Sequence, residues 1–152
     1  MTKFNKSIII NCPKEEAFEF HTDTNNLKLI TPPGIKVEIL SIKLPLELGS
    51  EIKLRVTQFG LLSNTWHIKL TDYIKDKLIT DTQQSGPFHK WIHRHKFEGS
   101  EGTCTMTDEI EYELPFGVLG RIADKVFVSG LIKKQFEFRH KVTKQLLEGN
   151  LK

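Results

Sequence analysis

The feature that most constrains this chain is a change of hydrophobic period near residue 115. Between residues 35 and 114 apolar and polar residues alternate, which is typical of strands with one buried face. Between residues 118 and 147 the apolar residues recur at helical spacing. The loops between the strands are short, so the strands should be antiparallel and one long helix should lie along their sheet.

Turn signals divide the alternating region into six strands. They contain the alternating stretches Ile35–Ile39, Ile52–Val56, Trp66–Leu70, Leu78–Thr80, His89–Phe97 and Thr103–Leu114. Glycine-containing sequences such as Leu48-Gly49-Ser50 and Ser85-Gly86-Pro87 separate several of them. A further strand, Lys3 to Asn11, precedes them. We therefore predict seven strands, paired mainly with their neighbours in sequence.

Two short helices should follow the first strand. Pro13 opens the first of them, because proline at the first helical position loses no hydrogen bond, and Glu15 and Glu16 favour the positive end of the helix dipole. The second runs from about Thr24 to Ile30, and the sequence Pro32-Pro33-Gly34 ends it.

The long helix is predicted over Val118 to Leu147, with a bend or a close approach at Gly130. Its apolar stripe contains Leu119, Ala123, Phe127, Leu131, Phe138 and Val142. Phe136 falls roughly opposite this stripe and should be exposed. A sheet that curves around such a helix should leave a gap lined by apolar and aromatic groups, which is the form of a ligand pocket.

Composition excludes several classes of protein. The 152 residues carry a formal charge of +3 and are 38% hydrophobic, which fits one globular domain over residues 1–152 and not a disordered chain. No apolar run approaches the roughly 20 residues of a membrane span, and there is no secretory signal, so we expect a cytoplasmic protein.

Cys12 and Cys104 should be reduced thiols. The basic residues near the C-terminus are expected to form a solvated helix face rather than a nucleic-acid site.

The stretch richest in chemistry lies over residues 89–97. On a strand, alternate residues share a face, so His93, His95 and Trp91 point the same way as His89 and Phe97. The other face is cationic and belongs in water. The imidazoles should therefore lie in or beside the cavity.

Asp108 shares a face of the last strand with apolar residues. A buried carboxylate is costly unless it is paired, so a nearby imidazole is the expected partner. Such a pair is either structural or a general base. A metal site is a further alternative, with His93 and His95 as two ligands and His67, His21 or Asp108 as a third. No other residues show ligand spacing, so we predict no metal and no other cofactor.

Two motifs stand out in the second half of the chain. The first consists of Asp81, Gln83, Gly86-Pro87-Phe88, Trp91, His93, His95 and Phe97; the second consists of Thr103 or Thr105, Met106, Asp108, Ile110, Tyr112, Pro115, Gly117 and Leu119-Gly120. With them the chain resembles, over essentially its whole length, the START-like helix-grip superfamily called SRPBCC, which includes birch-pollen-allergen-like proteins and polyketide cyclases. More narrowly, it resembles a bacterial ligand-binding branch, some members of which are described as cell-division-inhibitor-like.

The resemblance implies an α+β helix-grip fold, in which a curved seven-stranded antiparallel sheet surrounds the long C-terminal helix. It also implies a cavity between sheet and helix for a small hydrophobic molecule such as a lipid, an isoprenoid or an aromatic, polyketide-like metabolite. The ligand-binding residues are predicted to be Trp66, Trp91, His93, His95, Phe97, Met106, Asp108, Tyr112, Phe127 and Leu131.

Two further functions are considered beside ligand binding. One is a cyclase or aromatase-like enzyme that uses His93 or His95 with Asp108 as acid and base. The other is a regulatory interaction protein that uses an exposed Phe136 as a contact. The absence of a nucleophile elbow, a phosphate-binding glycine loop or a Rossmann fingerprint favours the binding protein, and we assign no catalytic residue. A homodimer is left open.

Overall fold

A seven-stranded antiparallel sheet forms the body of the molecule in the computed structural model, which describes residues 1–149. The strands are β1 (Thr2–Ile10), β2 (Ile35–Ile42), β3 (Glu51–Gln58), β4 (Leu62–Ile74), β5 (Leu78–Ser85), β6 (Lys90–Ser100) and β7 (Thr103–Glu113). Their order in the sheet is β1-β7-β6-β5-β4-β3-β2, so every pair except β1·β7 joins neighbours in sequence. The predicted number of strands and their antiparallel pairing are confirmed.

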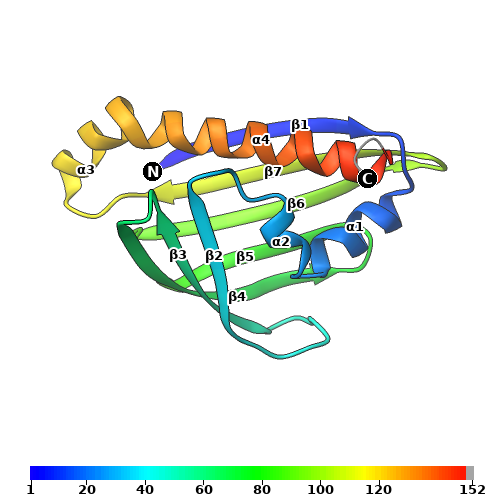
Figure 1. Ribbon diagram of the computed structural model, residues 1–152, viewed down its shortest axis with the longest axis horizontal. Helices are drawn as coiled ribbons and strands as arrows, with labels where there is room; N and C mark the ends of the chain where they lie inside the picture. Colours follow the sequence, from blue (N-terminus) through cyan, green and yellow to red (C-terminus); the bar gives the residue numbers. More distant parts are fainter. Residues whose placement is uncertain (150–152) are drawn as a thin grey trace.

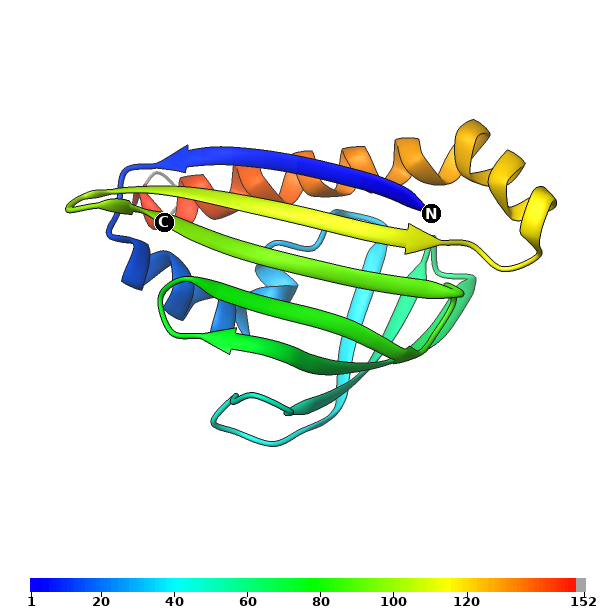
Figure 2. The ribbon, with the colours of Figure 1, turned by 180° about the vertical axis from the view of Figure 1, so that it is seen from behind.

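The helices of residues 1–149 all lie on one face of the sheet (Figures 1 and 2). They are α1 (Lys14–Thr22), α2 (Asn26–Leu29), α3 (Gly117–Ala123) and α4 (Ser129–Leu147), with a π-helical turn, η1 (Asp124–Val128), between α3 and α4. Pro13 stands just before the first residue of α1 and not within the helix as predicted, while Glu15 and Glu16 do occupy its first turn. The helix-grip fold is confirmed.

Irregular pairing accompanies the curvature of the sheet. The register between β2 and β3 shifts between Ile39 and Ser41, and the register between β4 and β5 shifts at His67/Ile68 and again at Leu70/Asp72. Extra residues at such bulges bend a strand and increase its twist. As a result β2 and β3 cross in front of the other strands instead of continuing them in one plane (Figure 1).

Strict alternation of burial is clearest on β6 and β7. Trp91, His93, His95 and Phe97 are buried on β6, and the residues between them are partly exposed. His89 precedes β6 and is exposed, so its predicted place on the inward face is wrong. The inward face therefore carries two imidazoles from this strand.

The predicted face of the long helix is also wrong. Ile132, Phe136, His140 and Thr143 are the buried residues of α4, and Phe136 is only 2% exposed. None of the six residues of the predicted stripe is buried, and Leu119 and Phe127 are more than half exposed. The face on the sheet includes a histidine and a threonine, which an apolar pattern alone does not reveal.

The irregular part of this helix lies at η1 and not at Gly130. Gly130 is exposed, and a Cβ placed on it would have no neighbour within 4 Å, so neither a bend nor a close approach requires glycine there. Asp124, at the start of η1, is buried and accepts hydrogen bonds from Tyr112 Oη and Thr2 Oγ1, each at 2.5 Å. These bonds tie η1 to β7 and β1.

The buried apolar residues form three clusters. One joins β1 and α1 to β4, β5, β6 and β7 around Phe18 and Phe97. A second joins β6 and β7 to α4 around Trp91 and Phe136, and the third joins β3 and β4 around Leu54. Cys12 and Cys104 are free and buried. Among the described residues, no helix combines the length and the apolar character that crossing a bilayer would take.

Candidate functional site

A cavity of about 370 Å³ separates the helices from β2–β6, a size that falls within the range of small-molecule sites. Most of its wall is apolar. Leu27 and Ile30 come from the α2 region, Ile52 and Leu54 from β3, and Ile132 from α4. The cavity exists because the curved sheet cannot contact α4 along its whole width.

An aromatic group closes one side of the cavity. Trp66 and Trp91 meet edge to face with ring centroids 5.3 Å apart, and Phe88 lies 4.8 Å from Trp91. All three rings line the cavity. Such rings supply a large contact area for an apolar or aromatic ligand.

The structure divides the predicted ligand-binding residues into two groups. Trp66, Trp91, His93, His95, Phe127 and Leu131 line the cavity. The remaining four, Phe97, Met106, Asp108 and Tyr112, do not line it, because they are buried deeper in the protein. Strand periodicity identifies which residues point inward, but it does not distinguish those that reach the cavity from those that other elements cover.

Charged side chains gather at one point of the wall. His95 on β6 pairs with Asp108 on β7, and His93 pairs with Asp81 on β5. Because these strands are adjacent, alternate inward positions place two imidazoles between two carboxylates. His93, His95 and Asp81 face the cavity, whereas Asp108 lies behind them.

Asp108 is the centre of this group. Its Oδ1 accepts a hydrogen bond from His93 Nε2 at 2.8 Å, and its Oδ2 accepts one from His140 Nε2 at 2.6 Å. His95 Nδ1 lies 2.8 Å from the same Oδ1, close enough for an ion pair, although the angle is too poor for a hydrogen bond. Burial opposes the charge on Asp108, but the imidazoles outweigh it and hold the pKa of the carboxyl well below its usual range.

The two neighbouring imidazoles are in opposite protonation states. Burial opposes a charge on His95, but the carboxylates of Asp108 and Asp81 outweigh it and raise the pKa of His95 to about 9. Asp81 Oδ2 lies 3.3 Å from His95 Nε2. Burial and the charge on His95 lower the pKa of His93 to about 4. The ring centroids are 3.9 Å apart. At neutral pH an imidazolium therefore lies beside a neutral imidazole at the cavity wall.

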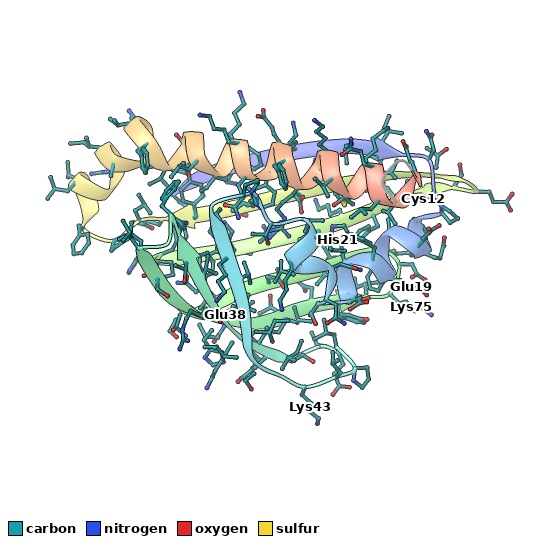
Figure 3. The ribbon with its side chains drawn as sticks, viewed as in Figure 1. Cys12, Glu19, His21, Glu38, Lys43 and Lys75 are labelled. Atoms are coloured by element: carbon teal, nitrogen blue, oxygen red, sulfur yellow. The ribbon has the colours of Figure 1, made fainter. Side chains whose placement is uncertain are left out.

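Two more basic groups face the cavity from the helices. His21, labelled in Figure 3, comes from the last turn of α1 and lies over the sheet, with its ring 5.5 Å from that of His95. Burial and the His95 charge lower the pKa of His21 to about 3. Arg139 lines the cavity with Cζ 5.1 Å from the Phe136 ring centroid, and it has no ion-pair partner among residues 1–149.

Sequence reasoning missed three members of this group. Asp81 was missed because Leu78 and Thr80 set the expected phase of β5, whereas Ile79 and Asp81 line the cavity. His140 and Arg139 were missed because the helix face was misplaced. A signal was present for Asp81, since it belongs to the first of the two motifs.

Asp81, His93 and His95 are the residues that could hold a metal ion. Each offers one ligand atom, and the three atoms lie within 4.8 Å of one another. Tetrahedral zinc with bonds of about 2.1 Å needs ligand atoms roughly 3.4 Å apart, and Asp81 Oδ2 and His95 Nε2 are 3.3 Å apart. His67, a suggested third ligand, instead pairs with Glu51 at 3.0 Å.

The comparisons with known proteins agree with this architecture. Residues 10–138 match a family model described as polyketide cyclase / dehydrase and lipid transport. No curated protein matches the chain.

Solved structures share the fold at low sequence identity. TTHA0849 from Thermus thermophilus is 14% identical with a TM-score of 0.78, over 99% of this chain and 100% of that one. A START superfamily protein from Mycobacterium smegmatis is 17% identical with a TM-score of 0.72, over 98% and 99% of the two chains. The Zhui aromatase/cyclase from Streptomyces sp. R1128 is 12% identical with a TM-score of 0.67, over 95% of each chain.

Proposed function

Because the chain belongs to the polyketide cyclase / dehydrase and lipid transport family, within the SRPBCC helix-grip superfamily, we propose that it binds a small, mainly apolar molecule in the cavity between sheet and α4. The observation that carries the proposal is the aromatic and aliphatic wall around about 370 Å³ of space. Water in such a space makes few hydrogen bonds, so displacing it costs little. An apolar ligand that enters the cavity also removes its own apolar surface from solvent, which favours binding.

The polar end of the cavity indicates the chemistry of the ligand. Asp81 and Asp108 carry two negative charges, and the His95 imidazolium and the Arg139 guanidinium carry two positive ones, so the group has no net charge. A ligand with a full charge would disturb this balance in a buried place, which is costly. We therefore expect an uncharged polar group, a hydroxyl or carbonyl oxygen, at this end, and an aromatic, isoprenoid or aliphatic body against the tryptophans.

A cavity-filling substitution tests this function. Leu54 is 8% exposed and lines the cavity, so Leu54→Trp should occupy part of the space. The wild type should bind the uncharged fluorophore N-phenyl-1-naphthylamine saturably with one site, and Leu54→Trp should weaken it by at least about tenfold. Ile74→Trp, at a position that is 52% exposed, is the matched control and should bind like the wild type.

Two results would count against ligand binding. One is the absence of saturable binding by the wild type. The other is equal affinity in the wild type and in a folded Leu54→Trp variant. Native mass spectrometry of protein purified from its own host should in addition detect a bound small molecule, and its mass would identify the ligand.

An enzymatic role is a second candidate, favoured by the imidazolium at the cavity wall. His95, protonated at neutral pH, has the properties of a general acid toward a carbonyl oxygen of the ligand, and the neighbouring Asp81 would hold its imidazolium in place. Asp108, the base expected from the sequence, lies behind the wall. If the protein is a cyclase, His95→Gln should abolish product formation from a poly-β-keto substrate while fluorophore affinity stays within about threefold of the wild type.

The regulatory hypothesis loses the residue on which it rested. Phe136 was expected to be an exposed contact, but it is 2% exposed and packs against Phe4 and His93.

A further inference from the structure

A large apolar surface lies outside the core, on α3 and η1. Six apolar side chains of this segment are more than half exposed: Phe116, Val118, Leu119, Ile122, Val126 and Phe127. Phe116 and Val126 reach 83% and 80%. Isolated exposed apolar residues are ordinary, but six of them within residues 116–127 are typical of an interaction surface. We call these six residues the apolar rim.

The rim is held in place by the rest of the fold. Asp124, at the start of η1, is buried and receives hydrogen bonds from Tyr112 and Thr2. Gly120 is buried beside the carbonyl oxygen of Pro115. The exposed side chains therefore belong to an anchored segment and not to a frayed helix end.

The rim is continuous with the cavity. Phe127 is 59% exposed and also lines the cavity, and Val128 and Leu131 continue the wall inward. The turn between β3 and β4 lies at the same end of the molecule as α3 in both ribbon views (Figures 1 and 2). Its Phe59 and Leu61 are 62% and 86% exposed, and Gln58, which precedes them, lines the cavity. Apolar groups therefore flank the cavity on both its helix side and its sheet side.

The exposed charges of the segment that carries the rim are of one sign. Between Phe116 and Gln135 the exposed charged residues are Arg121, Lys125, Lys133 and Lys134. The only acidic residue in this stretch, Asp124, is buried. The β3–β4 turn, residues 59–61, and the first three residues of β4 have no charged residue. Exposed apolar side chains with basic residues among them are the pattern of segments that lie in the surface of a membrane containing anionic lipids.

The same charges disfavour a second copy as the occupant. In a two-fold symmetric dimer through the rim, the patch of one chain that contains Arg121 and Lys125 would face the same patch of the other. With the only acidic residue buried, like charges would face each other across an apolar contact.

We propose that the apolar rim inserts into the surface of a lipid bilayer that contains anionic lipids, with the cavity facing the membrane. The rim supplies the apolar contact, and Arg121 and Lys125 supply attraction to the headgroups. This goes beyond ligand binding, and it can be tested without knowing the ligand.

Vesicle flotation of the full chain tests the proposal. The wild type should float with vesicles of phosphatidylcholine and phosphatidylglycerol, and less with phosphatidylcholine alone or at high salt. The double substitution Leu119→Asp/Val126→Asp should lower the partition coefficient at least about tenfold, since it places charge where apolar contact is needed. Neither residue lines the cavity, so fluorophore binding should be retained, which separates this test from that of the proposed function.

Matched controls come from the loop between β2 and β3. Leu44 and Leu48 are 60% and 64% exposed, so Leu44→Asp/Leu48→Asp adds the same charge elsewhere and should leave flotation unchanged. Arg121→Glu/Lys125→Glu should reduce flotation with anionic vesicles, whereas Lys43→Glu/Lys75→Glu, at the exposed positions labelled in Figure 3, should reduce it much less.

Three results would overturn the proposal. The first is a wild type that does not bind anionic vesicles. The second is an equal loss of binding in the rim variant and in its β2–β3 control. The third is a wild type that sediments as a dimer while Leu119→Asp/Val126→Asp sediments as a monomer, because the rim would then be covered by a second copy. Thermal unfolding of each variant checks that the exposed substitutions leave the fold intact.

Discussion

Asp108 lies directly opposite His95 in the pairing of β6 with β7, and its Oδ1 is 2.8 Å from the Nδ1 of that imidazole. The carboxylate is 2% exposed and faces no solvent, while the imidazole faces the cavity. One buried negative charge thus fixes a positive charge at the ligand site. Folding and the chemistry of the cavity depend on the same pair.

Replacing Asp108 should destabilise the protein strongly. Asp108→Asn removes the charge that compensates His95 and leaves buried imidazoles with an amide that cannot accept from all of them. Loss of one partner in a buried ion pair costs about 3–5 kcal/mol, so the urea midpoint should fall clearly. Asp72→Asn, at an exposed position on β4, is the control and should change stability by less than about 0.5 kcal/mol. Equal stabilities would mean that the network contributes nothing to folding.

The free energy of unfolding should fall on the basic side of neutrality. The folded-state pKa of His95, about 9, lies above the ordinary value of 6.5. The charge on His95 therefore contributes fully to the free energy of unfolding below pH 6.5, and this contribution is lost as pH rises through 9. Its size is on the order of 3 kcal/mol at most. Urea titrations between about pH 6 and 10 should show this loss, and His95→Gln should remove it. His67→Gln, which breaks only the contact with Glu51, should keep it.

Stability should also fall on the acid side, for a different reason. The pKa values of Asp81 and Asp108 are lowered, and those of His93 and His21 are lowered to about 4 and 3. All four groups take up protons more readily in the unfolded chain, so their contribution is lost as pH falls below about 6.5. The stability maximum is then expected between roughly pH 6 and 7. A curve that is flat from about pH 4 to 7 would contradict these protonation states.

The sheet could be predicted from the sequence because one physical constraint acts on every strand. Each strand buries one face, so alternation on β6 and β7 gives both the strand and its inward residues. His93, His95 and Asp108 were placed together in this way, and their contacts confirm the pairing. The curvature was inferred from the need to surround a helix.

The rest of the site depends on how strands and helices are placed relative to one another, and a local sequence pattern does not determine this placement. Asp81 reaches His95 only through the register of β5 against β6, and β5 follows a hairpin with shifts in pairing. His140 reaches Asp108 only through the rotation of α4 about its axis. The apolar spacing led to the wrong rotation, because Leu119 and Phe127 are apolar but do not pack in the core.

The rotation of α4 can be checked by comparing two phenylalanines of the same segment. Phe136 is 2% exposed and contacts Phe4 and His93, so Phe136→Ala should cost about 3–5 kcal/mol by leaving a cavity. Phe127 is 59% exposed, and Phe127→Ala should cost less than about 1 kcal/mol. Urea unfolding of both variants provides the measurement. The reverse order would restore the helix face that the sequence suggested.

Two glycines of the C-terminal segment should respond oppositely to alanine. Gly130 is exposed in α4, and a Cβ there would meet nothing within 4 Å, so Gly130→Ala should stabilise the protein by about 0.5–1 kcal/mol through higher helix propensity. At Gly120 a Cβ would collide with the carbonyl oxygen of Pro115, and the neighbouring Leu114 leaves no room to retreat, so Gly120→Ala should cost roughly 1–3 kcal/mol. Thermal unfolding of the two variants measures both effects. If Gly120→Ala were as stable as the wild type, α3 would not be held against the end of β7, and the anchored position of the apolar rim would be wrong.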